Sequence, residues 1–221
     1  MPCSPDRSIL FIHIPKTGGS SIEQALGIYG PWELENQDIL FGLIQSAELL
    51  AHGWGSVFLQ HLGWRELQQQ WDFSRAKIFA AVRNPWARFA STYTNTDPHL
   101  KQMARAQGIE LEGLSFEEFV AATEHLEHAH LRPQLDYLVA TDGELAVNNL
   151  LRTEQLNADF QQLCKQLGLE LELPCANRSK KSRPYEELYS PASWQWIGKR
   201  YAMDVDSLGY GSYNGRISKC Q

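Results

Sequence analysis

The stretch FIHIPKTGGSSIEQAL, residues 11–26, constrains the fold more than any other part of the sequence. It overlaps an apolar run over residues 8–14 that is typical of a strand buried on both faces of a sheet. Apolar residues at helical spacing begin after Ser20. The N–H groups at the start of a helix attract anions. The stretch therefore predicts a strand, an anion-binding loop and a helix in direct succession.

The residues between the strand and the helix supply the groups that an anion needs. Two glycines let the backbone approach an anion without a Cβ in the way, a lysine adds positive charge, and three hydroxyls can donate. These residues are Lys16, Thr17, Gly18, Gly19, Ser20 and Ser21. The alternative is a tight turn with an exposed lysine. The order differs from the Walker loop of nucleotide-binding proteins, in which the lysine follows the glycines.

Two further apolar runs, at residues 55–61 and 77–83, are each followed by a helical pattern. Three strand-then-helix units predict an α/β fold with a central, mainly parallel sheet flanked by helices. The length suits one domain over residues 1–221, with a helical and polar insertion around residues 95–130. Within that insertion, the polar residues 95–113 are expected to form a connection or a lid.

Several helix ends are also marked in the sequence. Ser115 and Glu118 form a capping box, and Gly168 follows an apolar helix stripe. Ser190 precedes Pro191 at the start of a later helical pattern, and TDG at residues 141–143 is a turn signal.

Composition limits the classes of partner. The net charge of -6 argues against nonspecific nucleic-acid binding as the main task, so cationic contacts to an anionic ligand would be local. No apolar run approaches the roughly 20 residues of a membrane span, and the first residues lack the apolar centre of a signal peptide. The cysteines show no metal-binding spacing and are expected to be reduced thiols in a cytoplasmic protein. They are Cys3, Cys164, Cys175 and Cys220.

A second motif, RNPWARFASTY, occupies residues 83–93. Arg83 ends the third apolar run, and the carboxyl ends of parallel strands are where α/β proteins bind ligands. Arg83 and Ser91 could hold a second phosphate through charge-assisted hydrogen bonds. The alternative is an ordinary strand–helix junction with solvated arginines.

Together the two motifs resemble those of the sulfotransferases. HIPKTGGSS is similar to their 5′-phosphosulfate loop, and RNPWARFASTY to their 3′-phosphate motif, R-[ND]-P-x-x-R-x-x-S-x-Y. The order of the motifs and the separation of about 67 residues between Lys16 and Arg83 also fit. The resemblance is to the family that includes Golgi carbohydrate sulfotransferases of the heparan-sulfate 2-O type and their soluble bacterial relatives. Ser20 departs mildly from it, because many relatives have threonine there.

The resemblance implies a P-loop-NTPase-like sulfotransferase fold and a donor, 3′-phosphoadenosine-5′-phosphosulfate (PAPS), with 3′,5′-phosphoadenosine (PAP) as product. It implies that residues 16–21 hold the 5′-phosphosulfate and that Arg83 and Ser91 hold the 3′-phosphate. Arg178, in the basic segment at residues 177–183, is a further candidate contact, although a solvated loop is the simpler interpretation. No metal is expected. The acceptor would carry a hydroxyl group, with carbohydrate suggested by the relatives alone.

His61 is the candidate base that takes the proton of the acceptor hydroxyl. We expect it at the end of a second strand, on the same sheet edge as both motifs, and relatives use a histidine in a similar context. Lys16 would follow the leaving phosphate oxygen with its charge. His13 is expected to be a hydrogen-bonded core residue, and His52 is a weaker rival. The histidines of HLEHAH, at residues 125–130, are expected to lie in a solvated polar segment, and acceptor binding is the alternative.

Two other functions fit parts of the sequence. A nucleotide-dependent kinase on the same type of sheet would need magnesium and a Walker lysine, and the order of the loop residues argues against it. A non-catalytic phosphoadenosine-binding protein would bind PAP without turnover, although Lys16 and His61 speak mildly for catalysis.

Overall fold

The computed structural model describes residues 2–174 and 184–211. The chain forms two compact units. The first consists of Met1–Val82 and Gln134–Ala176, and the second of Arg83–Pro133 and Asn177–Gln221. Arg178 and the basic segment around it, together with Cys175 and Cys220, lie outside the described residues.

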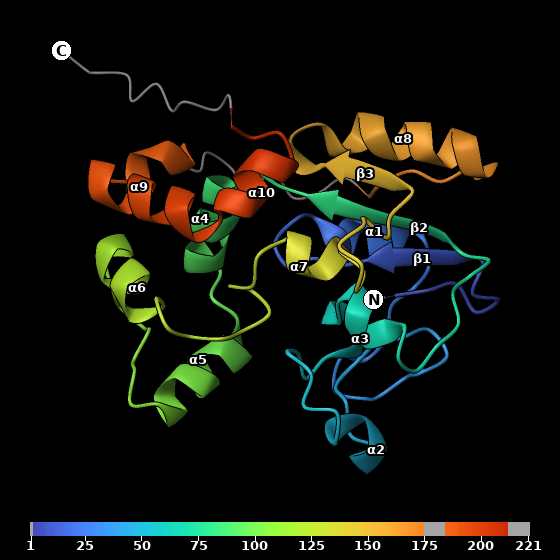
Figure 1. The fold of residues 1–221 in the computed structure, drawn as a ribbon, viewed down its shortest axis with the longest axis horizontal. Helices are drawn as coiled ribbons and strands as arrows, with labels where there is room; N and C mark the ends of the chain where they lie inside the picture. Colours follow the sequence, from blue (N-terminus) through green and yellow to red (C-terminus); the bar gives the residue numbers. More distant parts are fainter. Residues whose placement is uncertain (1, 175–183, 212–221) are drawn as a thin grey trace. The chain divides into compact units, whose positions relative to one another are not determined.

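The first unit is built on a parallel sheet in the order β1-β2-β3, visible in Figure 1. Its strands are β1 (Ile9–Ile12), β2 (Lys77–Val82) and β3 (Asn149–Arg152). In register, Phe11 lies beside Phe79, and Phe79 beside Asn149. This arrangement confirms the predicted α/β class with a parallel sheet.

One face of the sheet is covered by α1 (Gly19–Ala25) and α8 (Leu156–Leu167), and Figure 1 shows α8 running alongside β3. Ile22 of α1 and Phe160 of α8 pack in one buried cluster with Phe11 and Phe79, whose rings stack at 5.0 Å. Gly168 ends α8 with a φ of 69°, the left-handed conformation that glycine adopts most easily. The predicted helix and its end are therefore confirmed.

The prediction of a strand at residues 55–61 is wrong. Residues 57–59 instead pair locally with residues 42–44, through bonds from the Ile44 N–H to the Val57 carbonyl (2.8 Å) and from the Leu59 N–H to the Gly42 carbonyl (2.9 Å). The chain then turns into the 3-10 helix η1 (Leu59–His61) and the short helix α3 (Trp64–Leu67). This apolar run therefore pairs outside the parallel sheet. The third strand of the sheet is β3.

The remaining elements of the first unit are short. The predicted TDG turn is present, since Val139 and Leu145 face each other in an antiparallel bridge. The elements are α2 (Ala47–Leu50), α7 (Leu135–Leu138) and the 3-10 helix η2 (Thr153–Gln155).

The second unit is helical in its described part. Both predicted helix starts are confirmed, because Ser115 with Glu118 caps α6 and Ser190 caps α9. The elements are α4 (Pro85–Thr94), α5 (Pro98–Ala106), α6 (Phe116–Ala122), the 3-10 helix η3 (Tyr185–Leu188), α9 (Pro191–Arg200) and α10 (Ala202–Ser207).

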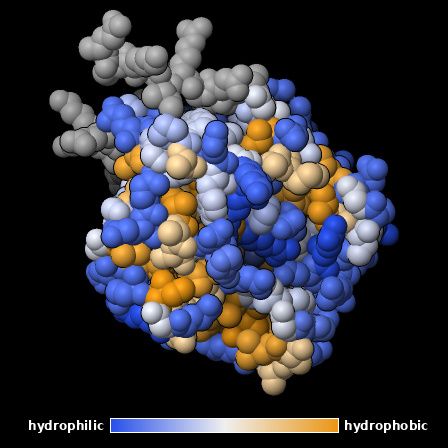
Figure 2. All heavy atoms as spheres, turned by 60° about the vertical axis from the view of Figure 1, so that its left-hand side comes forward, coloured by the Kyte–Doolittle hydropathy of each residue, from blue (hydrophilic) through white to orange (hydrophobic). Residues whose placement is uncertain are grey.

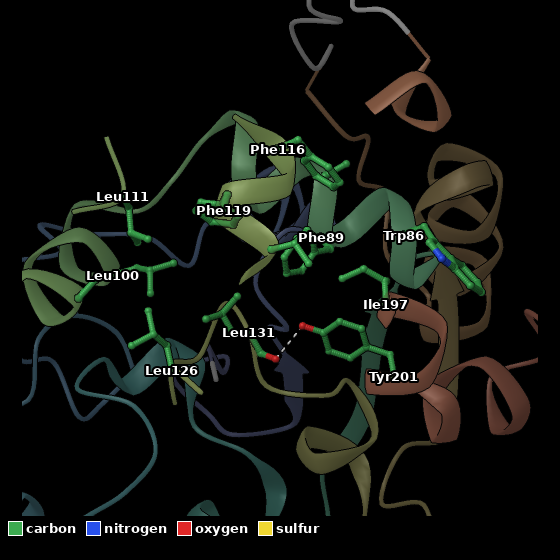
Figure 3. Packing of buried hydrophobic residues seen from close by; sticks show 13 residues of the cluster. Trp86, Phe89, Leu100, Leu111, Phe116, Phe119, Leu126, Leu131, Ile197 and Tyr201 are labelled. Atoms are coloured by element: carbon green, nitrogen blue, oxygen red, sulfur yellow. Dashed lines mark hydrogen bonds between the residues drawn. The ribbon is translucent and has the colours of Figure 1, made fainter. Parts of the chain in front are cut away.

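The core of the second unit is shown in Figure 3. Phe89 packs edge-on against Phe116 and Phe119, with ring centroids 5.9 and 5.8 Å apart. The buried Tyr201 hydroxyl donates to the Leu131 carbonyl at 2.9 Å, the dashed line of that view. Segments far apart in the sequence are thereby joined into one cluster.

Residues 95–113, for which a connection or a lid was expected, contain the packed helix α5 and contribute to the core of the second unit. Leu100 and Ala104 lie on one face of α5 and are fully buried in the cluster of Figure 3, as is most of Leu111. Apolar residues four apart on a short helix were enough to bury this otherwise polar segment.

The surface is mostly hydrophilic on the face shown in Figure 2, with hydrophobic side chains in separate smaller patches. Within the described residues, no helix combines the length and the apolar character that a membrane crossing requires.

Candidate functional site

The loop between β1 and α1 has an unusual backbone. Lys16 has a φ of 71° and Gly18 a φ of 86°, both in the left-handed region. A lysine in that region costs on the order of 1 kcal/mol, and such residues are found in backbone concavities that bind anions. The conformation needs support from the surrounding structure.

The hydroxyl groups of two threonines supply that support. Thr17 is fully buried, and its hydroxyl donates to the Ile14 carbonyl at 2.9 Å. The Thr153 hydroxyl lies 2.8 Å from the Thr17 carbonyl and 3.0 Å from the Val82 carbonyl. Thr153 thus ties the loop to the end of β2. Sequence reasoning missed it, although its position directly after β3 is where ligand-site residues of parallel sheets occur.

The start of α1 presents the predicted hydroxyls and charge. Gly18 is the N-cap and no side chain caps the helix. Ser20 is exposed and Ser21 and Lys16 are half-buried. A seven-residue helix has a small dipole. The N–H groups at its start, the hydroxyls and the lysine charge therefore contribute more than the dipole to binding an anion here.

The two glycines are also required by contacts within the protein, in addition to the predicted approach of an anion, which stays a prediction. A Cβ at Gly19 would lie 2.1 Å from Cδ2 and 2.2 Å from Nε2 of His13, and one at Gly18 would lie 2.8 Å from a methyl group of Leu156. Real Cβ contacts are never this short. Internal packing and the positive φ of Gly18 therefore already demand glycine, before any ligand approaches.

His13 is held beneath the loop by Glu23 of α1. The two side chains are 6% and 5% exposed, and His13 Nδ1 lies 2.5 Å from a Glu23 carboxylate oxygen. The His13 ring also stacks on Phe11 at 5.5 Å. The expected hydrogen-bonded core role of His13 agrees with this arrangement, but its partner was not foreseen.

His61 lies directly against His13. Their rings meet edge to face at 4.7 Å, and His61 Nδ1 is 3.2 Å from the His13 backbone carbonyl. Because a carbonyl only accepts, Nδ1 of His61 carries the proton and donates it. In the neutral ring, Nε2 is then the nitrogen with the lone pair, as a general base requires. His61 reaches this place from η1 rather than from a strand end.

Much of the RNPWARFASTY motif serves the fold of the second unit. The Asn84 side chain caps α4 by accepting from the N–H groups of Trp86 and Ala87 at 3.0 and 3.2 Å. The buried Arg88 guanidinium donates to the carbonyl of Arg132 at 2.8 Å. The Tyr93 hydroxyl donates to the Leu114 carbonyl at 3.0 Å. These positions are explained by packing, without a ligand.

Arg83 and Ser91 are half-buried in the second unit. Arg83 directly follows the last residue of β2 in the chain, and Ser91 lies on α4. Their assignment to the 3′-phosphate stays a prediction, as does that of Arg178, which lies outside the described residues.

A model of the sulfotransferase family matches residues 2–211. The chain belongs to the sulfotransferase family. This confirms the family that the two motifs resemble. No curated protein and no solved structure matches the chain. The protein is accordingly a transferase whose family uses a sulfonate donor, and the lysine, the hydroxyls and the backbone of the 15–21 loop are suited to such an anion.

This sulfotransferase also contains a cluster of Asp97, His99 and His128. Within residues 2–174 and 184–211, it is the group whose ligand atoms could hold a metal ion, all lying within 4.8 Å of one another. The His128 side chain is only 8% exposed, so the expectation of a solvated segment is wrong for it, whereas His125 is 92% exposed. Packing against α5 explains the burial.

Hydrogen bonds account for this cluster without a metal. The His130 N–H donates to Nδ1 of His128 at 3.2 Å, so the ring proton of neutral His128 is on Nε2. That nitrogen lies 3.3 Å from Nδ1 of His99 and can donate to it. A metal on Nε2 would have to displace this proton. Asp97 meanwhile caps α5 by accepting from the His99 and Leu100 N–H groups.

The burial of His128 predicts a pH-dependent stability. Desolvation lowers the pKa of His128 from 6.5 to about 4, a shift that Asp97 opposes and His99 reinforces. Between those values the unfolded chain binds more protons than the folded one, so stability falls as the pH falls from about 6.5 to about 4. The full loss is about 3 kcal/mol.

Urea unfolding between pH 7 and pH 4 would measure this effect. His128→Asn should flatten the dependence relative to wild type, and the exposed His125→Asn should leave it unchanged. Equal slopes for both variants would show that His128 does not cause the effect.

The packing of His13 against the loop predicts the outcome of Gly19→Ala. The added methyl group must displace the His13 ring, which overpacks a buried site and costs about 1–3 kcal/mol of unfolding free energy. Gly30→Ala is the matched control, because its Cβ would meet its nearest atom at 4.0 Å. Denaturant titration of the two variants compares them, and equal stabilities would contradict the described contact.

Proposed function

We propose that this sulfotransferase transfers a sulfuryl group from PAPS to a hydroxyl of a carbohydrate acceptor by in-line displacement. The observation that carries the proposal is the hydrogen bond from His61 Nδ1 to the His13 carbonyl, because it sets the tautomer of a general base beside the anion-binding loop. The family supports transfer of a sulfonate group, while the donor and the acceptor are part of the proposal.

The donor is proposed to bind at its two anionic ends. Lys16, the N–H groups of the 17–21 segment and the nearby hydroxyls hold the 5′-phosphosulfate. Arg83 and Ser91 hold the 3′-phosphate, with Arg178 as a further contact. The support for the first group is the geometry of the loop, and the support for the second is the motif and the family it belongs to.

The reaction needs a base and a stabilised leaving group. As the bond from the acceptor oxygen to sulfur forms, the acceptor proton moves to Nε2 of His61. The bond between sulfur and the phosphate oxygen breaks, and the Lys16 ammonium balances the charge that develops on that oxygen. The loop is already held in shape by Thr17 and Thr153, so little reorganisation accompanies the reaction.

Two substitutions separate these roles. His61→Ala should lower kcat by about 10²–10⁴ because proton transfer is lost, and should leave PAP affinity nearly unchanged. Lys16→Ala should impair both transfer and PAP binding. Sulfate transfer is measured by mass spectrometry with labelled PAPS over a panel of hydroxyl acceptors, and binding by calorimetry.

His52→Ala is the control for the histidine, since His52 is exposed and contacts Gln70. If His61→Ala weakened PAP binding as much as it slowed transfer, His61 would not be the base.

Arg83→Ala tests the 3′-phosphate assignment. Losing a charge-assisted hydrogen bond is worth about 1.5–3 kcal/mol, so PAP binding should weaken by about 10- to 100-fold while binding of 5′-AMP stays the same. Calorimetry with both nucleotides measures the difference, and Arg75→Ala, at an exposed arginine of the first unit, is the control. An equal effect of Arg83→Ala on both nucleotides would remove Arg83 from the 3′-phosphate site.

A further inference from the structure

Exposed hydrophobic side chains gather in one short segment of the first unit. Tyr29, Trp32 and Leu34 are 65%, 56% and 58% exposed and lie within six residues of one another. We call these three residues the 29–34 patch. Single exposed hydrophobic residues are common, but a group of them marks a binding surface.

A chain of rings connects this patch to the candidate base. Trp32 meets Phe58 edge to face at 6.1 Å, and Phe58 in turn meets His61 edge to face at 6.4 Å. Trp32 is therefore separated from His61 by one aromatic side chain. These residues all belong to the first unit.

The backbone holds Trp32 in this position. The Leu43 N–H donates to the Trp32 carbonyl at 2.8 Å, and Leu43 faces Phe58 in an antiparallel bridge. The Leu34 carbonyl packs so closely against Gly42 that a Cβ added there would lie 1.7 Å from the carbonyl oxygen. The patch is thus fixed relative to the site and is not a loose loop.

The polar groups around the patch indicate the chemistry of its ligand. Residues 29–38 contain three acidic side chains, two amides and no lysine or arginine. Glu33, Asn36, Gln37 and Asp38 are exposed. Carboxylates and amides accept hydrogen bonds from hydroxyl groups, and the face of a tryptophan packs against the C–H face of a sugar ring. The negative charge would repel a polyanion.

We propose that the 29–34 patch is an acceptor subsite in which Trp32 stacks on a neutral sugar ring, next to the sugar whose hydroxyl reacts at His61. This inference rests on the proposed function and narrows it. The acceptor is an uncharged oligosaccharide, and a heavily sulfated polysaccharide is excluded by the acidic surroundings of Trp32.

Fluorine NMR tests the binding without requiring turnover. The protein is labelled with 5-fluorotryptophan, and the Trp32 resonance is the one that disappears in Trp32→Phe. With PAP present, a neutral tetrasaccharide from a panel of cellotetraose, maltotetraose and chitotetraose should shift this resonance, and a heparin tetrasaccharide should not. The proposal is overturned if no neutral probe shifts it, or if the heparin probe binds more tightly.

Kinetics separates this inference from the proposed function. With the neutral acceptor, Trp32→Ala should raise the acceptor KM at least tenfold and leave kcat and the PAPS KM unchanged, and Trp32→Phe should recover part of the loss. Leu145→Ala, at another exposed hydrophobic residue of the same unit, is the control. An unchanged acceptor KM in Trp32→Ala overturns the subsite while the transferase activity stands. A shifted Trp32 resonance with no transfer by wild type supports the subsite and overturns the proposed reaction.

Discussion

The buried hydrogen bond between His13 and Glu23 determines most of the geometry of the first unit's site. A buried carboxylate is costly unless it is partnered, and Glu23 meets His13 at 2.5 Å. His13 follows β1 and Glu23 lies on α1, so the bond joins the two elements on either side of the loop. The ring that Glu23 orients fills the space beside Gly19, and the His13 carbonyl orients His61. This interaction thus links the start of α1 to the residue whose carbonyl orients the candidate base, while Thr17 and Thr153 support the loop itself.

The energy cost of the strained Lys16 backbone can be compared with the energy of the hydrogen bonds that hold the loop. Its left-handed conformation costs on the order of 1 kcal/mol, and each hydrogen bond of Thr17 and Thr153 contributes about as much in the opposite direction. The surrounding contacts are therefore sufficient to hold a conformation that an isolated peptide would avoid. A loop held in this way is organised before any anion arrives, which is the form of electrostatic stabilisation that acts most strongly on a developing charge.

The sequence allowed the first strand, the loop and the helix after it to be predicted, because their patterns are local and strong. The run at residues 55–61 had the same local pattern, but its partner is the nearby 42–44 segment, and only the tertiary pairing reveals that. The prediction that His61 lies near the loop relied on a strand at residues 55–61, and that strand does not form. The contact of Glu23 joins residues whose individual patterns are ordinary, so no signal in a single sequence identifies it. Thr153 could be suspected only once β3 is recognised as a strand, because it directly follows that strand.

The RNPWARFASTY motif contains residues that stabilise the fold as well as residues that we propose bind a ligand. Asn84, Arg88 and Tyr93 have interior partners that explain them by folding alone. These three positions therefore reflect how the second unit folds and say little about what it binds. We therefore expect chemical specificity to depend on other positions of the motif, such as Arg83, which we propose for the 3′-phosphate. The motif is therefore stronger evidence for the sulfotransferase fold than for the donor, and the donor is decided by how binding responds to a 3′-phosphate.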